Sequence, residues 1–150
     1  MHSIVDLGGG LTMFPDARGS RAATRVLYID DNEVNLRVVA ALMEALDIAV
    51  TCHSSASNAL DLLENEAFDM VFTDIHMPEM SGFDVLRELR GREGPNQAAP
   101  VVALTADLTR DAAQYSELGF SGFVPKPVTL RALCECLLAV WSAEGRASAA

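Results

Sequence analysis

Polar residues close several short apolar runs of this sequence, and their types suit phosphoryl chemistry. Asp30 and Asp31 follow one run, while Asp74, Thr105 and Lys126 close three later ones. A set of carboxylates with no nearby His or Cys ligand pair favours a hard cation, Mg²⁺ over Zn²⁺. Lys126 and the Thr105 hydroxyl are suitable partners for phosphoryl oxygens. These residues predict a magnesium-assisted phosphoryl site.

Asp74 is the carboxylate that we expect to accept the phosphoryl group. Carboxylates are known covalent acceptors of such groups. Asp74 stands alone, whereas Asp30 and Asp31 are adjacent and suit the holding of a metal. Three crowded carboxylates repel one another unless positive groups join them. A bound metal and Lys126 would supply that charge and would neutralise the transferring phosphoryl group.

The elements that must position these residues follow from the apolar pattern. Strands are predicted at 25–30, 48–53, 68–74, 100–105 and 122–126, and helices at 34–46, 56–65, 83–90, 109–118 and 130–142. Short strands that alternate with helices pair in parallel, and right-handed crossovers place helices on both faces of the sheet. All carboxyl ends of such strands lie at one edge, where ligands bind. The sequence therefore predicts a (βα)5 doubly wound α/β domain whose polar residues converge there.

Composition limits the classes of function. The chain has 150 residues, 50% of them hydrophobic, and a net charge of −10, which disfavours direct binding to nucleic acid. No run approaches the roughly 18 apolar residues of a membrane span, so no membrane contact is expected. The odd number of cysteines, three, fits small buried side chains in a reducing, cytoplasmic compartment.

Three regions are expected along the chain. Residues 1–23 carry Gly8-Gly9-Gly10 and no sustained period, and are predicted to form a flexible arm or linker. Residues 24–143 form the folded domain. Residues 144–150 are small and polar, and are predicted to be a disordered stub.

Four segments give the chain a clear resemblance to a known family. They are VLYIDDNEVN (26–35), MVFTDIHMPEMSGFDVL (70–86), VVALTA (101–106) and GFVPKP (122–127). In this order and spacing they resemble the receiver domain of two-component response regulators. The DDNxxN opening and the D-I-x-M-P-x-M-x-G motif are most similar to receivers of hybrid sensor histidine kinases. The resemblance implies a flavodoxin-like sheet of order 2-1-3-4-5.

The resemblance also assigns roles to individual residues. It implies Asp74 as phosphoacceptor, Lys126 as the phosphate-contacting lysine, Thr105 and Phe123 as the switch pair, and Asp30, Asp31, Asp74 and the backbone carbonyl of His76 as Mg²⁺ ligands. The Lys126–Pro127 peptide is expected to be cis. Ser81 and Pro125 depart mildly from the family pattern, and neither departure removes a required group.

The function that the resemblance implies is a phosphorylation-dependent switch of protein contacts rather than an enzyme, apart from slow self-dephosphorylation. Its partner would be a histidine kinase or a histidine phosphotransfer protein. Four apolar residues of the last helix are candidates for the signalling face, although some must belong to the core: Leu130, Leu133, Leu137 and Trp141.

Simpler interpretations stay open beside these assignments. Asp30-Asp31 or Asp74 could cap the turn that follows, Thr105 could be an ordinary strand-end hydroxyl, and Phe123 could be core filler. A receiver that never takes phosphate would serve only as a docking module. An aspartyl-phosphate hydrolase of the haloacid-dehalogenase type would need D-x-D, whereas the chain has Asp74-Ile75-His76.

Overall fold

The computed structural model describes residues 24–149, and side chains up to residue 143. Strands and helices alternate throughout. The strands are β1 (Arg25–Ile29), β2 (Ala49–His53), β3 (Met70–Asp74), β4 (Val101–Thr105) and β5 (Gly122–Pro125). The helices are α1 (Glu33–Ala45), α2 (Ala56–Leu63), α3 (Gly82–Gly91), α4 (Ala112–Glu117) and α5 (Leu130–Ala149). The predicted arm, 1–23, lies outside the described residues.

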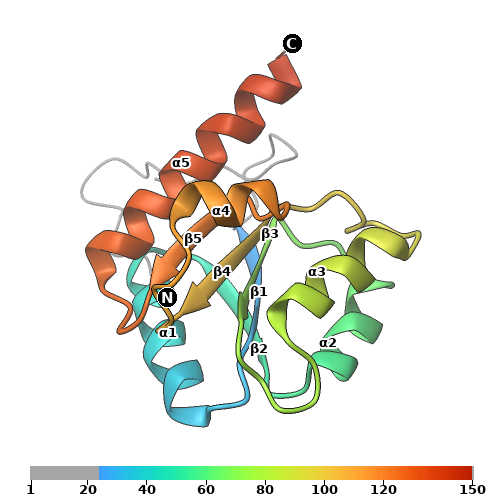
Figure 1. Cartoon of the computed structure of the whole chain (residues 1–150). Helices are drawn as coiled ribbons and strands as arrows, with labels where there is room; N and C mark the ends of the chain where they lie inside the picture. Colours follow the sequence, from blue (N-terminus) through green and yellow to red (C-terminus); the bar gives the residue numbers. More distant parts are fainter. Residues whose placement is uncertain (1–23, 150) are drawn as a thin grey trace.

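One parallel sheet of order β2-β1-β3-β4-β5 organises the domain. Helices α1 and α5 lie on one face of this sheet, and α2 and α3 lie on the other (Figure 1). The chain runs outward in one direction from β1 to β2 and in the opposite direction from β3 to β5. The strand order therefore reverses between β1 and β3, which is where ligands bind in open parallel sheets. The predicted fold class is confirmed.

Alternate residues of β1 show how both faces of the sheet are buried. Leu27 and Ile29 pack into the core beneath α2 and α3, whereas Val26 and Tyr28 pack into the core beneath α1 and α5. All four are completely buried. Burial on both faces explains why the strand sequence is a continuous apolar run instead of an alternating one.

Local capping explains where the structure departs from the predicted helix boundaries. Helix α4 begins at Ala112, not at 109, because the Asp111 carboxylate accepts a hydrogen bond from the Gln114 N–H, and the Gln114 side chain accepts one from the Asp111 N–H. Helix α5 continues to Ala149, past the predicted end at 142 and through most of the segment 144–150 predicted to be disordered. Ala, Glu and Arg favour helix there, and no proline interrupts it.

The apolar residues of α5 divide between the core and the surface. Leu133 and Leu137 are completely buried beneath the helix and so cannot form a signalling face. Leu130 is 43% exposed, and Trp141 is partly buried against the same core. Among the helices that the structure describes, none is long and apolar enough to cross a membrane.

The cysteines are less buried than the sequence predicts. Cys52, Cys134 and Cys136 are all free thiols of intermediate exposure. Burial raises the pKa of Cys52, and it raises that of Cys136 to about 11. Thiols with raised pKa values are weak nucleophiles at neutral pH, which agrees with a packing role.

Gly82 allows the β3–α3 loop to close tightly against β3. Its N–H donates to the Ile75 carbonyl at 2.9 Å. A Cβ at this position would lie 2.6 Å from the Asp74 carbonyl oxygen and 2.8 Å from the Ile75 side chain. The first of these contacts involves backbone, which cannot move aside without displacing Asp74. Gly91, at the other end of α3, has open space around the same position.

We expect Gly82→Ala to lower the free energy of unfolding by about 1–3 kcal/mol, because the added methyl group overpacks a rigid site. Gly91→Ala is the matched control, and it should leave stability unchanged or raise it by up to about 1 kcal/mol through helix propensity. Urea denaturation followed by circular dichroism measures both. Equal effects of the two substitutions would contradict the close packing at Gly82.

Candidate functional site

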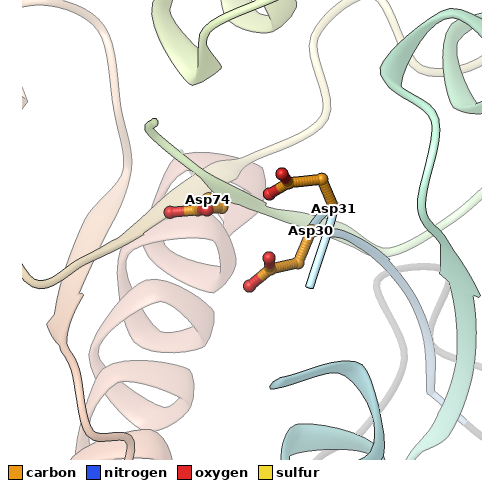
Figure 2. A group of neighbouring side chains, drawn as sticks. All are labelled: Asp30, Asp31 and Asp74. Carbon is orange, nitrogen blue, oxygen red and sulfur yellow. The ribbon is translucent and has the colours of Figure 1, made fainter. Parts of the chain in front are cut away.

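Three carboxylates meet at the carboxyl ends of β1 and β3. Asp30 and Asp31 follow β1, and Asp74 is the last residue of the neighbouring β3. Figure 2 shows the three carboxyl groups gathered at this edge of the sheet. Each offers one oxygen, and these oxygens lie within 4.8 Å of one another. The oxygen-only donor set fits a hard divalent cation such as Mg²⁺, as the sequence predicts.

Lys126 supplies the positive charge of this cluster. Its Nζ lies 2.9 Å from Asp30 Oδ2 and 3.3 Å from Asp74 Oδ1. Lys126 follows β5, and its backbone N–H donates to the Thr105 carbonyl at 2.9 Å. The ammonium group thus reaches two carboxylates that precede it by 96 and 52 residues (126 − 30 and 126 − 74). The predicted convergence of Asp30, Asp74 and Lys126 is present.

Asp30 is fully buried and is held by three donors. Tyr28 donates its hydroxyl to Asp30 Oδ2 at 2.6 Å, and Lys126 Nζ lies against the same oxygen. The Asn32 N–H donates to Asp30 Oδ1 at 2.9 Å. Tyr28 is a site contact that sequence reasoning missed, since it was assigned only to an apolar strand. The sequence does carry a signal for this contact: residues i and i+2 of a strand lie on the same face, so Tyr28 and Asp30 point the same way.

The carboxyl group of Asp74 is almost completely buried, and the residue is 7% exposed. Burial raises the pKa of Asp74, and the nearby Asp30 carboxylate raises it further. Lys126 and the His76 backbone N–H lower it but do not cancel the increase. When Asp74 is ionised, the negative charge of the three carboxylates exceeds the positive charge of Lys126. A bound cation would reduce this excess.

Thr105 and Phe123 lie on the adjacent strands β4 and β5. Thr105 is completely buried, and its hydroxyl accepts a hydrogen bond from the Asp107 N–H at 3.0 Å. The Phe123 ring is half-buried and stacks on Tyr115, with ring centroids 4.8 Å apart. Phe123 therefore packs against α4, which carries Tyr115.

His76 also contacts a residue that the sequence did not single out. Its side chain is 63% exposed, and its Nε2 lies 3.3 Å from Asp107 Oδ2. This contact joins the loop after β3 to the loop after β4. The role predicted for the His76 backbone carbonyl stays a prediction. The Lys126–Pro127 peptide is cis, as expected.

The family comparison agrees with this geometry. Residues 26–138 match the response regulator receiver domain. The chain belongs to this family. The match includes all the acidic residues of the site together with Thr105 and Lys126. It also separates the chain from the haloacid-dehalogenase class considered above.

Curated relatives of this receiver domain include sensor proteins and histidine kinases. The aerobic respiration control sensor protein ArcB of Escherichia coli is 31% identical over 122 residues, which cover 81% of this chain and 16% of that protein. The sensory/regulatory protein RpfC of Xanthomonas campestris is 37% identical over 115 residues, covering 75% and 16% respectively. The chain thus spans less than a fifth of each relative.

Solved structures show the same receiver fold. The receiver domain of sensor histidine kinase PA1611 from Pseudomonas aeruginosa is 25% identical with a TM-score of 0.71, covers 81% of this chain and 99% of its own, and has magnesium coordinated in its active site cleft. The structure of the Saccharomyces cerevisiae histidine phosphotransfer protein Ypd1 with the receiver domain of Ssk1 matches with a TM-score of 0.66 at 21% identity, and the match covers 83% of this chain and 88% of the other.

We expect Asp74→Asn to raise the free energy of unfolding at neutral pH in metal-free buffer. The folded receiver domain keeps the Asp74 proton to a higher pH than the unfolded chain does, so ionisation destabilises the fold as pH rises through the raised pKa. The gain should therefore shrink as pH falls toward the ordinary value of 3.8. Urea denaturation across this range, with EDTA present, measures it.

Asp84→Asn is a control of opposite sign. Hydrogen bonds from the Ser81 backbone and from Arg87 hold the pKa of Asp84 below its usual range, so removal of that charge should lower stability at neutral pH. If metal-free Asp74→Asn protein were less stable than wild type at neutral pH, this would contradict the destabilising effect of the Asp74 charge.

Proposed function

We propose that Asp74 is the phosphoacceptor of this receiver domain. The observation that carries the proposal is the position of Lys126 Nζ, which lies against both Asp30 and Asp74. A lysine in this place can neutralise the carboxylates before phosphorylation and contact a phosphoryl oxygen afterwards. Asp74 lies at the end of β3, the middle strand of the sheet.

The transfer itself needs little covalent chemistry from the protein. The P–N bond of a phosphohistidine breaks and a P–O bond to the Asp74 carboxylate forms, while the released imidazole keeps the electron pair and takes up a proton. Asp30, Asp31, Asp74 and the His76 carbonyl would hold Mg²⁺. When bound, the ion supplies positive charge that neutralises the phosphoryl oxygens. Lys126, which Asp30 also contacts, lies against Asp74 Oδ1 at this edge of the sheet.

Slow self-dephosphorylation is the second reaction that we propose for this site. A water molecule attacks phosphorus, the P–O bond to Asp74 breaks, and inorganic phosphate leaves with regeneration of the carboxylate. The signalling state is therefore temporary even without a second protein. This reaction turns the switch off and does not make the domain an enzyme for a separate substrate.

The output that we propose is a change at the α4 and β5 surface. A phosphoryl group on Asp74 would draw the Thr105 hydroxyl inward, away from the Asp107 N–H, and Phe123 would follow it and change its present stacking on Tyr115. Exposed apolar residues lie on the adjoining α5, including Leu130 and Leu138.

A Thr105→Val, Phe123→Leu protein should still be phosphorylated, but phosphorylation should no longer change its binding to the partner. Unchanged binding by the phosphorylated variant would exclude this coupling.

A phosphohistidine-carrying histidine kinase or histidine phosphotransfer protein is the partner that we propose. The relatives of this receiver domain are sensor proteins and histidine kinases, and a structurally similar receiver domain forms a complex with a histidine phosphotransfer protein. Helix α1 offers an apolar contact beside the acidic cluster, since Val34 is 65% exposed and Val38 is 48% exposed. Neither valine contributes to the core that α1 covers.

Intact mass spectrometry after incubation with Mg²⁺ and acetyl phosphate tests the phosphoacceptor role. Wild-type protein should gain one phosphoryl group, and Asp74→Ala should gain none. EDTA should suppress the adduct. Asp61→Ala is the matched control, because it removes an exposed carboxylate on α2 that does not belong to the cluster, and it should be phosphorylated as well as wild type.

Failure to form an adduct has two causes that a second measurement separates. Rapid hydrolysis would erase the adduct while the protein still bound beryllofluoride, a stable mimic of the phosphoryl group. Absence of both the adduct and beryllofluoride binding would exclude the phosphoacceptor role and would favour a docking module that does not use phosphate.

A further inference from the structure

The Tyr28 hydroxyl makes a short hydrogen bond in the interior of the site. Tyr28 is completely buried in β1, and its hydroxyl donates to Asp30 Oδ2 at 2.6 Å. Its ring packs among the residues beneath α1 and α5, which fixes where the hydroxyl can lie. The phenol is therefore a rigid donor that reaches the equally buried carboxylate of Asp30, two residues further along the chain.

The hydrogen bonds of Asp30 leave its two oxygens in different situations. Oδ2 accepts from both Tyr28 and Lys126, whereas Oδ1 accepts only the Asn32 N–H among the bonds described. Each carboxylate oxygen has about two acceptor positions. Oδ2 is thereby filled, and Oδ1 keeps a lone pair that can face a cation between Asp30, Asp31 and Asp74.

We propose that Tyr28 is a positioning residue of the metal site. Its hydrogen bond to Asp30 Oδ2 leaves Asp30 Oδ1 as the oxygen that binds Mg²⁺. The inference rests on the proposed phosphoacceptor function and extends it to a residue outside the acidic cluster. Tyr28 does not touch the metal or the phosphoryl group. Partners that orient a metal ligand in this way commonly change metal affinity by about 10-fold or more when they are removed.

Tyr28→Phe tests the proposal, since it removes the hydroxyl and keeps the ring. The dissociation constant for Mg²⁺, measured by isothermal titration calorimetry without a phosphodonor, should increase by about tenfold. Tyr115→Phe is the matched control, because Tyr115 is also buried but packs on the opposite face of the sheet. Its affinity for Mg²⁺ should equal that of wild type. An affinity of Tyr28→Phe within twofold of wild type would overturn the proposal.

The chemical shift of tyrosine labelled with ¹³C at Cζ, measured by nuclear magnetic resonance, reports on the hydroxyl itself. Mg²⁺ would not change this shift if the role of Tyr28 were purely structural. The chain has two tyrosines, so Tyr115→Phe leaves Tyr28 as the single signal. Mg²⁺ should shift this signal, because a cation on Asp30 weakens the oxygen as an acceptor. This measurement serves even if Tyr28→Phe fails to fold. A Tyr28 signal unmoved by saturating Mg²⁺ would also overturn the proposal.

The outcomes separate this inference from the proposed function. Wild-type protein that binds neither Mg²⁺ nor beryllofluoride would contradict the phosphoacceptor role itself. Wild-type protein that binds both, together with an unaffected Tyr28→Phe variant, would exclude only the positioning role of Tyr28.

Discussion

Electrostatic repulsion among Asp30, Asp31 and Asp74 is the constraint on which the rest of the site depends. Their oxygens lie within 4.8 Å of one another, and Asp30 is completely buried. Carboxylates this close destabilise a fold unless positive charge and hydrogen-bond donors accompany them. Lys126 supplies the charge, while Tyr28 and the Asn32 N–H supply donors. Burial and the nearby Asp30 carboxylate nevertheless raise the pKa of Asp74, and the three oxygens form a donor set that fits a cation.

The topology of the sheet makes this cluster possible. Because the strand order reverses between β1 and β3, the residues after these strands meet at one edge, with β4 and β5 beside them. Helices cover both faces, so the strands are rigid and the polar groups at their ends have fixed separations. The β3–α3 loop returns to β3 only because Gly82 has no side chain. A scaffold packed on both faces therefore holds the three carboxylates together at one edge of the sheet.

Much of the fold and of the site could be predicted from the sequence. The apolar runs and helical periods predicted the alternation of strands and helices, and the rule on parallel sheet edges placed Asp30, Asp74 and Lys126 together. What could not be predicted depends on side-chain direction and local capping. Asp111 sets the start of α4 through a capping box, and α5 extends where composition alone suggested disorder. The contacts from Tyr28 to Asp30 and from His76 to Asp107 depend on which way each side chain points.

Lys126 also allows a direct test of the central claim, which is that a phosphoryl group on Asp74 enters the existing contacts of this lysine. It is the only lysine of the chain, so selective ¹⁵N and ¹³C labelling of lysine gives one side-chain signal. We expect this signal to shift when Mg²⁺ and beryllofluoride are added to wild-type protein and to stay in place in Asp74→Ala. A signal that beryllofluoride leaves unchanged in wild type, or shifts equally in Asp74→Ala, would contradict the account.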